Sequence, residues 1–164
     1  MGYGVVRTDR MYGSDVGAGL VSFKYVVSDA ETEIENGNVV LLGELMDGER
    51  EIFEATTPAA ASKIKDIVLV AGVEVMYDER KKNLDEYINE AGKAVRGYRL
   101  HSGDIFSVTK DCLSGTPAVG SLVELQAGTK LNVVASATSG STQVGKIVHV
   151  ENAGRYTYYA VLVD

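Results

Sequence analysis

Hydrophobic residues recur along most of this chain in short runs that are separated by turn-forming residues. The runs are rich in Val, Ile, Leu and Tyr, and their lengths of four to eight residues are typical of β-strands. Asn36-Gly37-Asn38 and Asp47-Gly48 are clear turns, because Asn, Asp and Gly tolerate a positive φ. The pattern predicts a mainly β protein whose antiparallel strands form a barrel or a sandwich. The candidate strands are 21–27, 39–42, 67–73, 96–100, 105–109, 122–125, 131–134, 146–150 and 156–163.

One segment, 79–91, has a helical period instead. The apolar residues that share one helical face are Leu84, Tyr87, Ile88 and Ala91. Asp78 and Glu79 suit the start of a helix, where the macrodipole favours negative charge, and Gly92 suits its end. We therefore predict one short helix, or helical turns, within about 79–91.

The first twenty residues differ from the rest because they sustain neither period. Five glycines interrupt them, at positions 2, 4, 13, 17 and 19. This predicts an extended Gly-rich arm over 1–20, followed by a single β-rich domain over 21–164. Such an arm packs either on its own domain or on a neighbouring subunit, and the sequence leaves both alternatives open.

Composition narrows the classes of partner. The net charge of -7 and the pI of about 4.9 would repel a phosphate backbone, so we expect no nucleic-acid partner. The longest apolar run, 67–73, is far shorter than the roughly 18 residues that a membrane span needs. Cys112 is the only cysteine, which excludes an internal disulfide and a cysteine-built metal site.

The segment from Gly140 to Lys146, Gly-Ser-Thr-Gln-Val-Gly-Lys, nearly matches the motif of a phosphate-binding loop. The residue after Lys146 is Ile147, however, so the hydroxyl that would hold magnesium is missing. The β-branched residues that follow suit a strand better than the required helix. We interpret this segment as a turn that leads into a strand, and we predict no cofactor.

The other candidate groups for catalysis lie in unfavourable contexts. His101, Ser102 and Asp104 fall in one predicted turn, whereas triads are assembled from distant segments, and Asp104 is expected to hydrogen-bond the local backbone. His149 shares a strand face with Glu151, and a third metal ligand is lacking. Nothing near Cys112 clearly lowers its pKa. We predict no catalytic residues and expect a binding or assembly protein, not an enzyme.

The acidic residues Asp29, Glu31, Glu33 and Glu35 alternate along one short segment. Four carboxylates on one strand face would repel each other, and calcium could relieve that repulsion. The spacing of a calcium-binding loop is missing, so we favour a solvated acidic loop without a metal.

Several blocks of sequence are similar to those of a known family. Gly4–Asp9 leads to Leu20–Ser22, and the later blocks are 36–40, 48–51, 55–56, 96–100, 117–120 and 155–159. Together they resemble a family of small structural virion proteins from tailed bacteriophages of Gram-positive bacteria, above all the capsid decoration, or head-stabilising, proteins. The resemblance spans nearly the whole chain, but it rests on turns and strand edges, so it carries over no individual contact residue.

The resemblance implies a function without chemistry. Such proteins sit on the outer surface of the capsid in the virion, after synthesis in the cytoplasm of the host bacterium. They bind the major capsid protein, often as trimers, and cement neighbouring capsid subunits. Their avidity comes from many weak contacts that symmetry repeats.

The N-terminal arm is the part of the chain that we expect to bind such a partner, because an extended segment can pair with a neighbour's sheet edge. The residues predicted to bind the capsid or a neighbouring subunit are Tyr3, Val5, Val6, Arg7, Met11 and Tyr12. The alternative is that these residues cover the core of their own domain.

Two other classes of function stay open. The chain could be another phage structural component, such as a head fibre base or a tail-tube protein, and a long β-hairpin would favour the tube. It could also be an enzyme or a carbohydrate-binding module, and binding to cell-wall polysaccharide would favour that class. The absence of Trp makes a sugar-stacking surface less favourable.

Overall fold

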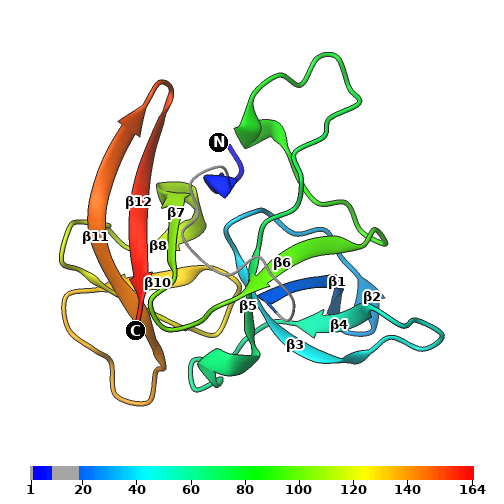
Figure 1. Ribbon diagram of the computed structural model, residues 1–164, viewed down its shortest axis with the longest axis horizontal. Helices are drawn as coiled ribbons and strands as arrows, with labels where there is room; N and C mark the ends of the chain where they lie inside the picture. Colours follow the sequence, from blue (N-terminus) through cyan, green and yellow to red (C-terminus); the bar gives the residue numbers. More distant parts are fainter. Residues whose placement is uncertain (1, 9–18) are drawn as a thin grey trace.

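The computed structural model describes residues 2–8 and 19–164, and within them the chain is almost entirely β (Figure 1). This confirms the predicted fold class. The strands are β1 Leu20–Val27, β2 Ala30–Glu31, β3 Val39–Leu45, β4 Ile52–Thr56, β5 Ile67–Val70, β6 Val95–Arg99, β7 Ile105–Thr109, β8 Leu113–Ser114, β9 Leu122–Glu124, β10 Leu131–Val134, β11 Gln143–Ala153 and β12 Tyr156–Val163. The helical elements between them are the 3-10 turns Ile64–Asp66, Leu84–Glu86 and Lys110–Cys112.

The first half of the chain forms a closed five-stranded barrel. Its order is β1-β4-β3-β5-β6, and β6 returns to pair with β1, while β2 extends β1 as a short hairpin. Most pairs are antiparallel as predicted, but β1 and β4 run parallel. Phe23, Val40 and Val68 fill the interior. Gly97 lets β6 approach this core, because a Cβ there would lie 2.3 Å from a Val68 methyl group and 2.9 Å from the Phe23 ring.

The second half forms a curled six-stranded sheet in the order β7-β12-β11-β9-β10-β8. The hairpin β11–β12 is its longest element, and a register shift between Ile147 and His149 bends it. The outer face of β3 and β5 packs on this sheet, so that Val39, Ile67 and Leu69 share one core with residues of the second sheet such as Phe106 and Val161.

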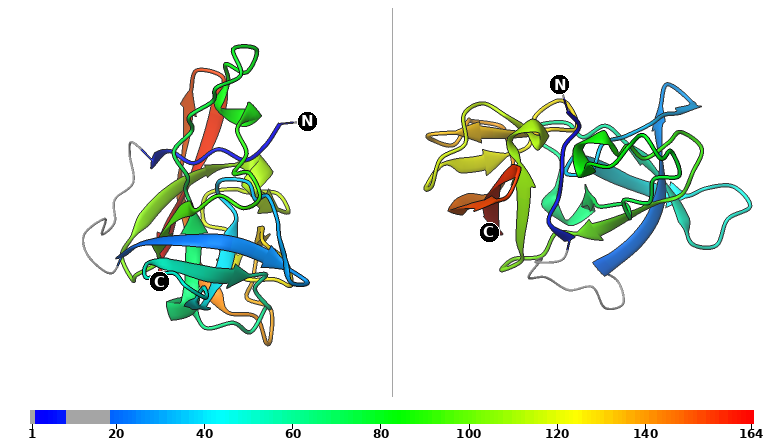
Figure 2. Two further views of the ribbon diagram at one scale, coloured as in Figure 1. Left: turned by 90° about the vertical axis from the view of Figure 1, so that its right-hand side faces the viewer. Right: turned by 90° about the horizontal axis from the view of Figure 1, so that it is seen from above.

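The N-terminal segment, residues 2–8, packs on its own chain between the second sheet and the barrel (Figure 2). Val5 and Val6 are 1% and 2% exposed. Val6 forms a bridge with Val108 of β7, the Thr109 N–H donates to the Val5 carbonyl at 3.0 Å, and the Arg7 N–H donates to the Ser107 carbonyl at 3.0 Å. The described part of the predicted arm therefore follows the first of the two alternatives.

The described segment 79–91 contains no α-helix. Of the two predicted forms, a short helix or helical turns, only the second is present, as the 3-10 turn Leu84–Glu86. Tyr87 already returns to an extended conformation, with φ -86° and ψ 137°. The chain then returns to the barrel, where Asn89 is buried and forms an antiparallel β-bridge with Ile34. Leu84 stays 38% exposed. A segment of this length forms a stable helix only when its apolar face is packed, so the helical period produces no more than one turn here.

Candidate interaction surface

The most conspicuous feature on the surface is the long connection between β5 and β6, residues 71–94, which we call the excursion. It projects from the barrel beside the tip of the β11–β12 hairpin (Figure 1). In its outgoing limb, Val73, Val75 and Tyr77 are 53%, 53% and 91% exposed, whereas the residues between them are partly buried. No strand pairs with this limb in the described structure. Three apolar side chains therefore line an unpaired segment.

Exposed apolar side chains are concentrated here. Of the nine large hydrophobic residues that are exposed in the described parts of the chain, the excursion contributes four, namely Val73, Val75, Tyr77 and Leu84. Tyr3 is a fifth, and its N–H donates to the Asp85 carbonyl at 2.9 Å, which places it at the same end of the molecule. Clusters of this kind mark interaction sites, whereas isolated exposed hydrophobic residues need no explanation.

Two buried asparagines fix the base of the excursion. The Asn36 side chain accepts from the Gly72 N–H at 2.8 Å and donates to the Gly72 carbonyl at 3.0 Å. Asn89, on the returning limb, donates to the Asn36 Oδ1 at 2.9 Å and to the Ile34 carbonyl at 2.9 Å. Because both limbs are tied to the same side chain, the excursion leaves the barrel in a defined direction.

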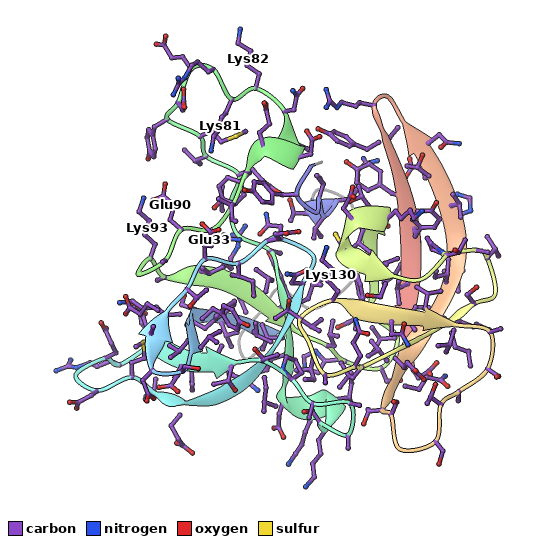
Figure 3. All side chains as sticks on the ribbon, turned by 180° about the vertical axis from the view of Figure 1, so that it is seen from behind. Glu33, Lys81, Lys82, Glu90, Lys93 and Lys130 are labelled. Carbon is purple, nitrogen blue, oxygen red and sulfur yellow. The ribbon has the colours of Figure 1, made fainter. Side chains whose placement is uncertain are left out.

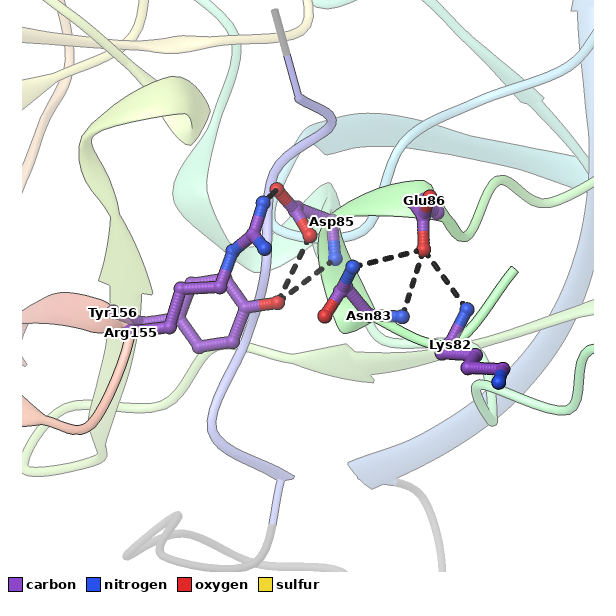
Figure 4. A network of polar contacts seen from close by, with 6 residues as sticks. All are labelled: Lys82, Asn83, Asp85, Glu86, Arg155 and Tyr156. Atoms are coloured by element: carbon purple, nitrogen blue, oxygen red, sulfur yellow. Dashed lines mark hydrogen bonds and ion pairs between the residues drawn. The ribbon is translucent and has the colours of Figure 1, made fainter. Parts of the chain in front are cut away.

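A second junction fixes the far side of the excursion, around Asp85 (Figure 4). Its carboxylate accepts from the Tyr156 hydroxyl at 2.9 Å and from the Arg155 guanidinium at 3.1 Å, and both donors lie at the tip of the β11–β12 hairpin. Burial, followed by the hydrogen bond to Asp85, raises the pKa of Tyr156, so its hydroxyl stays protonated as a donor. With the bond from the Tyr3 N–H, this junction connects excursion, hairpin and N-terminal segment.

A pocket of about 360 Å³ opens between the two limbs of the excursion. Val73 and Val75 line it from the outgoing limb, and Tyr87, Ile88 and Val95 from the returning side. Its charged lining residues are Asp78, Lys81, Glu86, Glu90 and Lys93. The pocket therefore combines an apolar wall with a charged rim.

The residues predicted to bind a partner do not form one surface among the described residues. Val5 and Val6 fill the core of their own chain, so neither side chain is accessible in this conformation. Arg7 lies over the Tyr158 ring at 5.2 Å and pairs with Glu151 at 3.4 Å. Among the four of these residues that the structure describes, Tyr3 alone is exposed, at 37%. Met11 and Tyr12 lie outside the described residues.

The turn interpretations of the candidate chemical groups hold. Asp104 accepts from the His101 backbone N–H at 2.9 Å, as expected for a local turn. Gly140 has a φ of 87°, and β11 follows it, so the segment is a turn that leads into a strand. Gly145 packs on β12 so closely that a Cβ would lie 1.9 Å from the Leu162 carbonyl oxygen. His149 is exposed, and Glu151 pairs with Arg7.

The acidic segment is only partly solvated. Glu31 pairs with Lys24 at 3.0 Å, and Glu35 accepts from the Gly4 N–H at 3.2 Å, while Glu33 is exposed. Within residues 2–8 and 19–164, no group of three or more His, Cys, Asp or Glu residues is placed to hold a metal ion.

Two buried ionisable groups have structural roles. Burial raises the pKa of the Cys112 thiol to about 12, and its sulfur packs against the backbone of Val5 and Asn36. Burial alone would raise the pKa of Glu124, but hydrogen bonds from Thr138 and Asn132 outweigh it and hold that pKa below its ordinary value. The Thr138 N–H donates to this carboxylate at 3.0 Å and so ties down the loop before β11.

The exposed residues of the excursion are not predicted by the sequence pattern. The run 67–73 predicts one buried strand, whereas β5 ends at Val70. The available signal was the spacing of Val73, Val75 and Tyr77, because residues two apart share one face of an extended chain.

Comparison of the chain with protein-family models, curated proteins and solved structures finds no match. Among the described residues there is no helix of sufficient length and apolarity to span a bilayer.

Proposed function

We propose that this chain is a non-enzymatic structural protein of a phage virion, which binds the outer surface of the capsid and cements neighbouring major capsid subunits as a decoration protein. The observation that carries the proposal is the concentration of exposed apolar side chains on the excursion. The sequence resemblance supplies the identity of the partner, the major capsid protein, and the expectation of a homotrimer.

The geometry supports binding to a protein partner. Tyr77 is 91% exposed and Tyr side chains are common anchors in interfaces, because they bury a large area and lose little rotational freedom. The hydrogen bonds of Asn36 at the base of the excursion and the junction at Asp85 hold the excursion in place before any partner binds. Ordering costs that oppose binding are therefore small, which suits a protein that depends on modest contacts repeated over a shell.

The test is co-sedimentation of the purified protein with mature, DNA-filled and empty heads of the source phage, with the stoichiometry measured on a quantitative gel. We expect saturable binding near one copy per capsid subunit. Tyr77→Ala should weaken binding by roughly tenfold or more, because a truncated anchor costs on the order of 2 kcal/mol. Its stability should change by no more than about 0.5 kcal/mol, since the side chain is exposed.

Val119→Ala is the matched control. Val119 is 63% exposed but lies in the loop before β9, away from the excursion. It should bind heads like the wild type. Absence of any head binding by the wild type would refute the proposal. Equal effects of Tyr77→Ala and Val119→Ala on head binding would show that the excursion is not the binding surface.

One observation favours a second candidate, a tail-tube component. The β11–β12 hairpin is long, with its paired residues running from Gly145–Val163 to Ala153–Tyr156 at the tip, and its tip projects beside the excursion (Figure 1). A tube protein would assemble into rings or tubes through such a hairpin. Analytical ultracentrifugation and negative-stain microscopy distinguish the candidates, because discrete trimers support decoration and stacked rings support the tube.

A further inference from the structure

The part of β11 nearest the hairpin tip has an outer edge that no strand covers in the described structure. β9 pairs with β11 only between Gln143 and Lys146, and the Ile147 N–H then donates to the Ser121 carbonyl at 2.9 Å. Residues 148–153, which we call the outer edge of β11, pair with β12 on their other side. In Figure 1 this part of β11 is the outermost strand on its side of the molecule.

The two terminal strands of the same sheet are protected. The N-terminal segment occupies the edge of β7 through the bridge between Val6 and Val108, and β8 is only two residues long. The outer edge of β11 spans about 20 Å and contains neither the proline nor the lysine that often blocks pairing at native edges. The register shift between Ile147 and His149 lies at one end of it. Another strand can therefore be added to this sheet at the outer edge of β11.

The backbone of this edge is directed outward at Val150. In β12, the Val163 N–H donates away from β11, to the Asp104 carbonyl at 2.9 Å. Backbone direction alternates along an antiparallel strand, so Ala160, three residues earlier, directs its N–H and carbonyl toward β11, where it is paired with His149. Val150 is the next residue of β11, so its own N–H and carbonyl point to the outer edge.

A second copy of the same edge is complementary to it in one register. With a two-fold axis at Val150, His149 lies opposite Glu151 of the second copy, and the same pair recurs on the other side of the axis. An axis one residue away places two Glu151 or two His149 side chains opposite each other, and like charges across strands are destabilising. A neutral imidazole donates a hydrogen bond to a carboxylate, and a protonated one adds an opposite charge. The arrangement of charges therefore favours the axis at Val150.

We propose that two copies of this chain associate by antiparallel pairing of their β11 outer edges around a two-fold axis at Val150. The Val150 backbone of each copy bonds that of the other, and the two six-stranded sheets become continuous. Glu151 contacts Arg7 through Oε2 and its side chain is still 35% exposed, so the carboxylate can also accept from the imidazole of the second copy. The contact is isologous and closed, because each copy uses the same edge.

This association goes beyond the proposed function, because it requires no capsid. Figure 3 places Lys81, Lys82 and Lys93 of the excursion on the side of the molecule away from β11, so pairing leaves that side of the excursion exposed. So short an edge buries less than the roughly 1,000 Å² of a stable interface, and we expect the association to be weak. It can join two single copies or two of the trimers that the proposed function expects.

The first test is sedimentation of the wild-type chain over a range of concentrations up to about 1 mM, where a weak contact is populated. We expect the average mass to rise toward species with an even number of copies, namely dimers or, where trimers form, hexamers. A mass that stays at one copy or at three copies over this range would overturn the proposal.

Engineered cysteines test the register. Val150→Cys should form a disulfide between two copies when oxidised glutathione is added, because a hydrogen-bonded antiparallel pair has Cα atoms about 5.5 Å apart. Asn152→Cys is the matched control. It is the more exposed site, but its symmetry mate lies about 14 Å away along the strand, so its yield should be several-fold lower. Cys112 is buried and should not compete. Equal yields at the two sites would contradict this register.

Two substitutions at one exposed site test the charges. His149→Glu should weaken association about three- to tenfold, because two repulsions with Glu151 replace two favourable pairs. His149→Lys should associate as well as the wild type or more tightly. His149 is exposed, so neither substitution should disturb the fold. Equal effects of the two substitutions would refute the pairing of His149 with Glu151.

Head binding separates this proposal from the proposed function. Heads that bind a chain showing neither an even-numbered species nor the Val150→Cys disulfide would leave decoration in place and refute the two-fold contact. The disulfide in a chain that binds no heads would support the contact and refute decoration.

Discussion

Truncation of Val6 tests whether the N-terminal segment belongs to the core of the isolated chain. Val6 is 2% exposed and packs in the same cluster as Phe106, Val108 and Cys112. Val6→Ala removes two buried methyl-sized groups, which corresponds to about 1.6 kcal/mol of transfer free energy at ~0.8 kcal/mol for each. The cavity that remains raises the expected loss to about 2 to 3 kcal/mol.

Urea denaturation measures this change as a shift in midpoint at constant m-value. For a chain of this length, the same loss lowers Tm by roughly 4 to 12 °C. Val119→Ala, at a 63% exposed site, should stay within about 0.5 kcal/mol of the wild type. A Val6→Ala variant as stable as this control would refute cis docking. A loss that disappears at high protein concentration would instead indicate docking between copies.

Four further predictions concern single contacts. Gly37→Ala should destabilise the fold strongly, because Gly37 has a φ of +81° and a Cβ there would lie 2.3 Å from the Cys112 sulfur. In a double-mutant cycle followed by denaturation, adding Cys112→Ala should restore part of the lost stability and leave about 1 to 2 kcal/mol of backbone strain. The Cys112 thiol, with a pKa near 12, should resist a thiol reagent at pH 8 until urea unfolds the chain; fast labelling of the native protein would contradict its burial. The pKa of Glu124 in the folded chain lies below its unfolded value near 4.5. The contribution of this carboxylate to stability is therefore complete above that pH and is lost as pH falls through the folded pKa. Urea denaturation midpoints measured from pH 3 to 7 should depend less on pH in Glu124→Gln than in the wild type. Tyr156→Phe should accelerate hydrogen exchange around Asp85 while Cys112 stays protected, and unchanged exchange there would show that the junction does not hold the excursion.

The sequence predicted those parts of the fold that depend on neighbouring residues. The turn at Gly37 requires a positive φ, which glycine adopts without strain, and the runs 105–109 and 156–163 coincide with β7 and β12. The predicted turn at Asp47-Gly48 likewise has a Gly48 φ of 78°. In each case the local backbone preference and the final structure agree.

Closure and pairing could not be predicted, because they join residues that lie far apart in the chain. Leu20 pairs with Tyr98 to close the barrel, and no local pattern specifies that contact. The parallel pairing of β1 and β4 is equally remote from any turn signal. The site was missed for a related reason. Leu84 belongs to a helical pattern, but a short segment forms a stable helix only where its apolar face is packed, and Leu84 stays 38% exposed.

β7 joins the beginning of the described chain to its end, and this has a consequence for synthesis on the ribosome. Val6 bridges Val108 on one edge of β7, and Tyr158–Leu162 pair with its other edge. The N-terminal segment therefore emerges before β7, the strand on which it docks, and β7 has no inner neighbour until β12 is made. During that interval the nascent chain exposes unpaired strand edges, which are templates for pairing with other chains. Where many copies are translated together, the greatest risk of misassociation precedes the synthesis of β12.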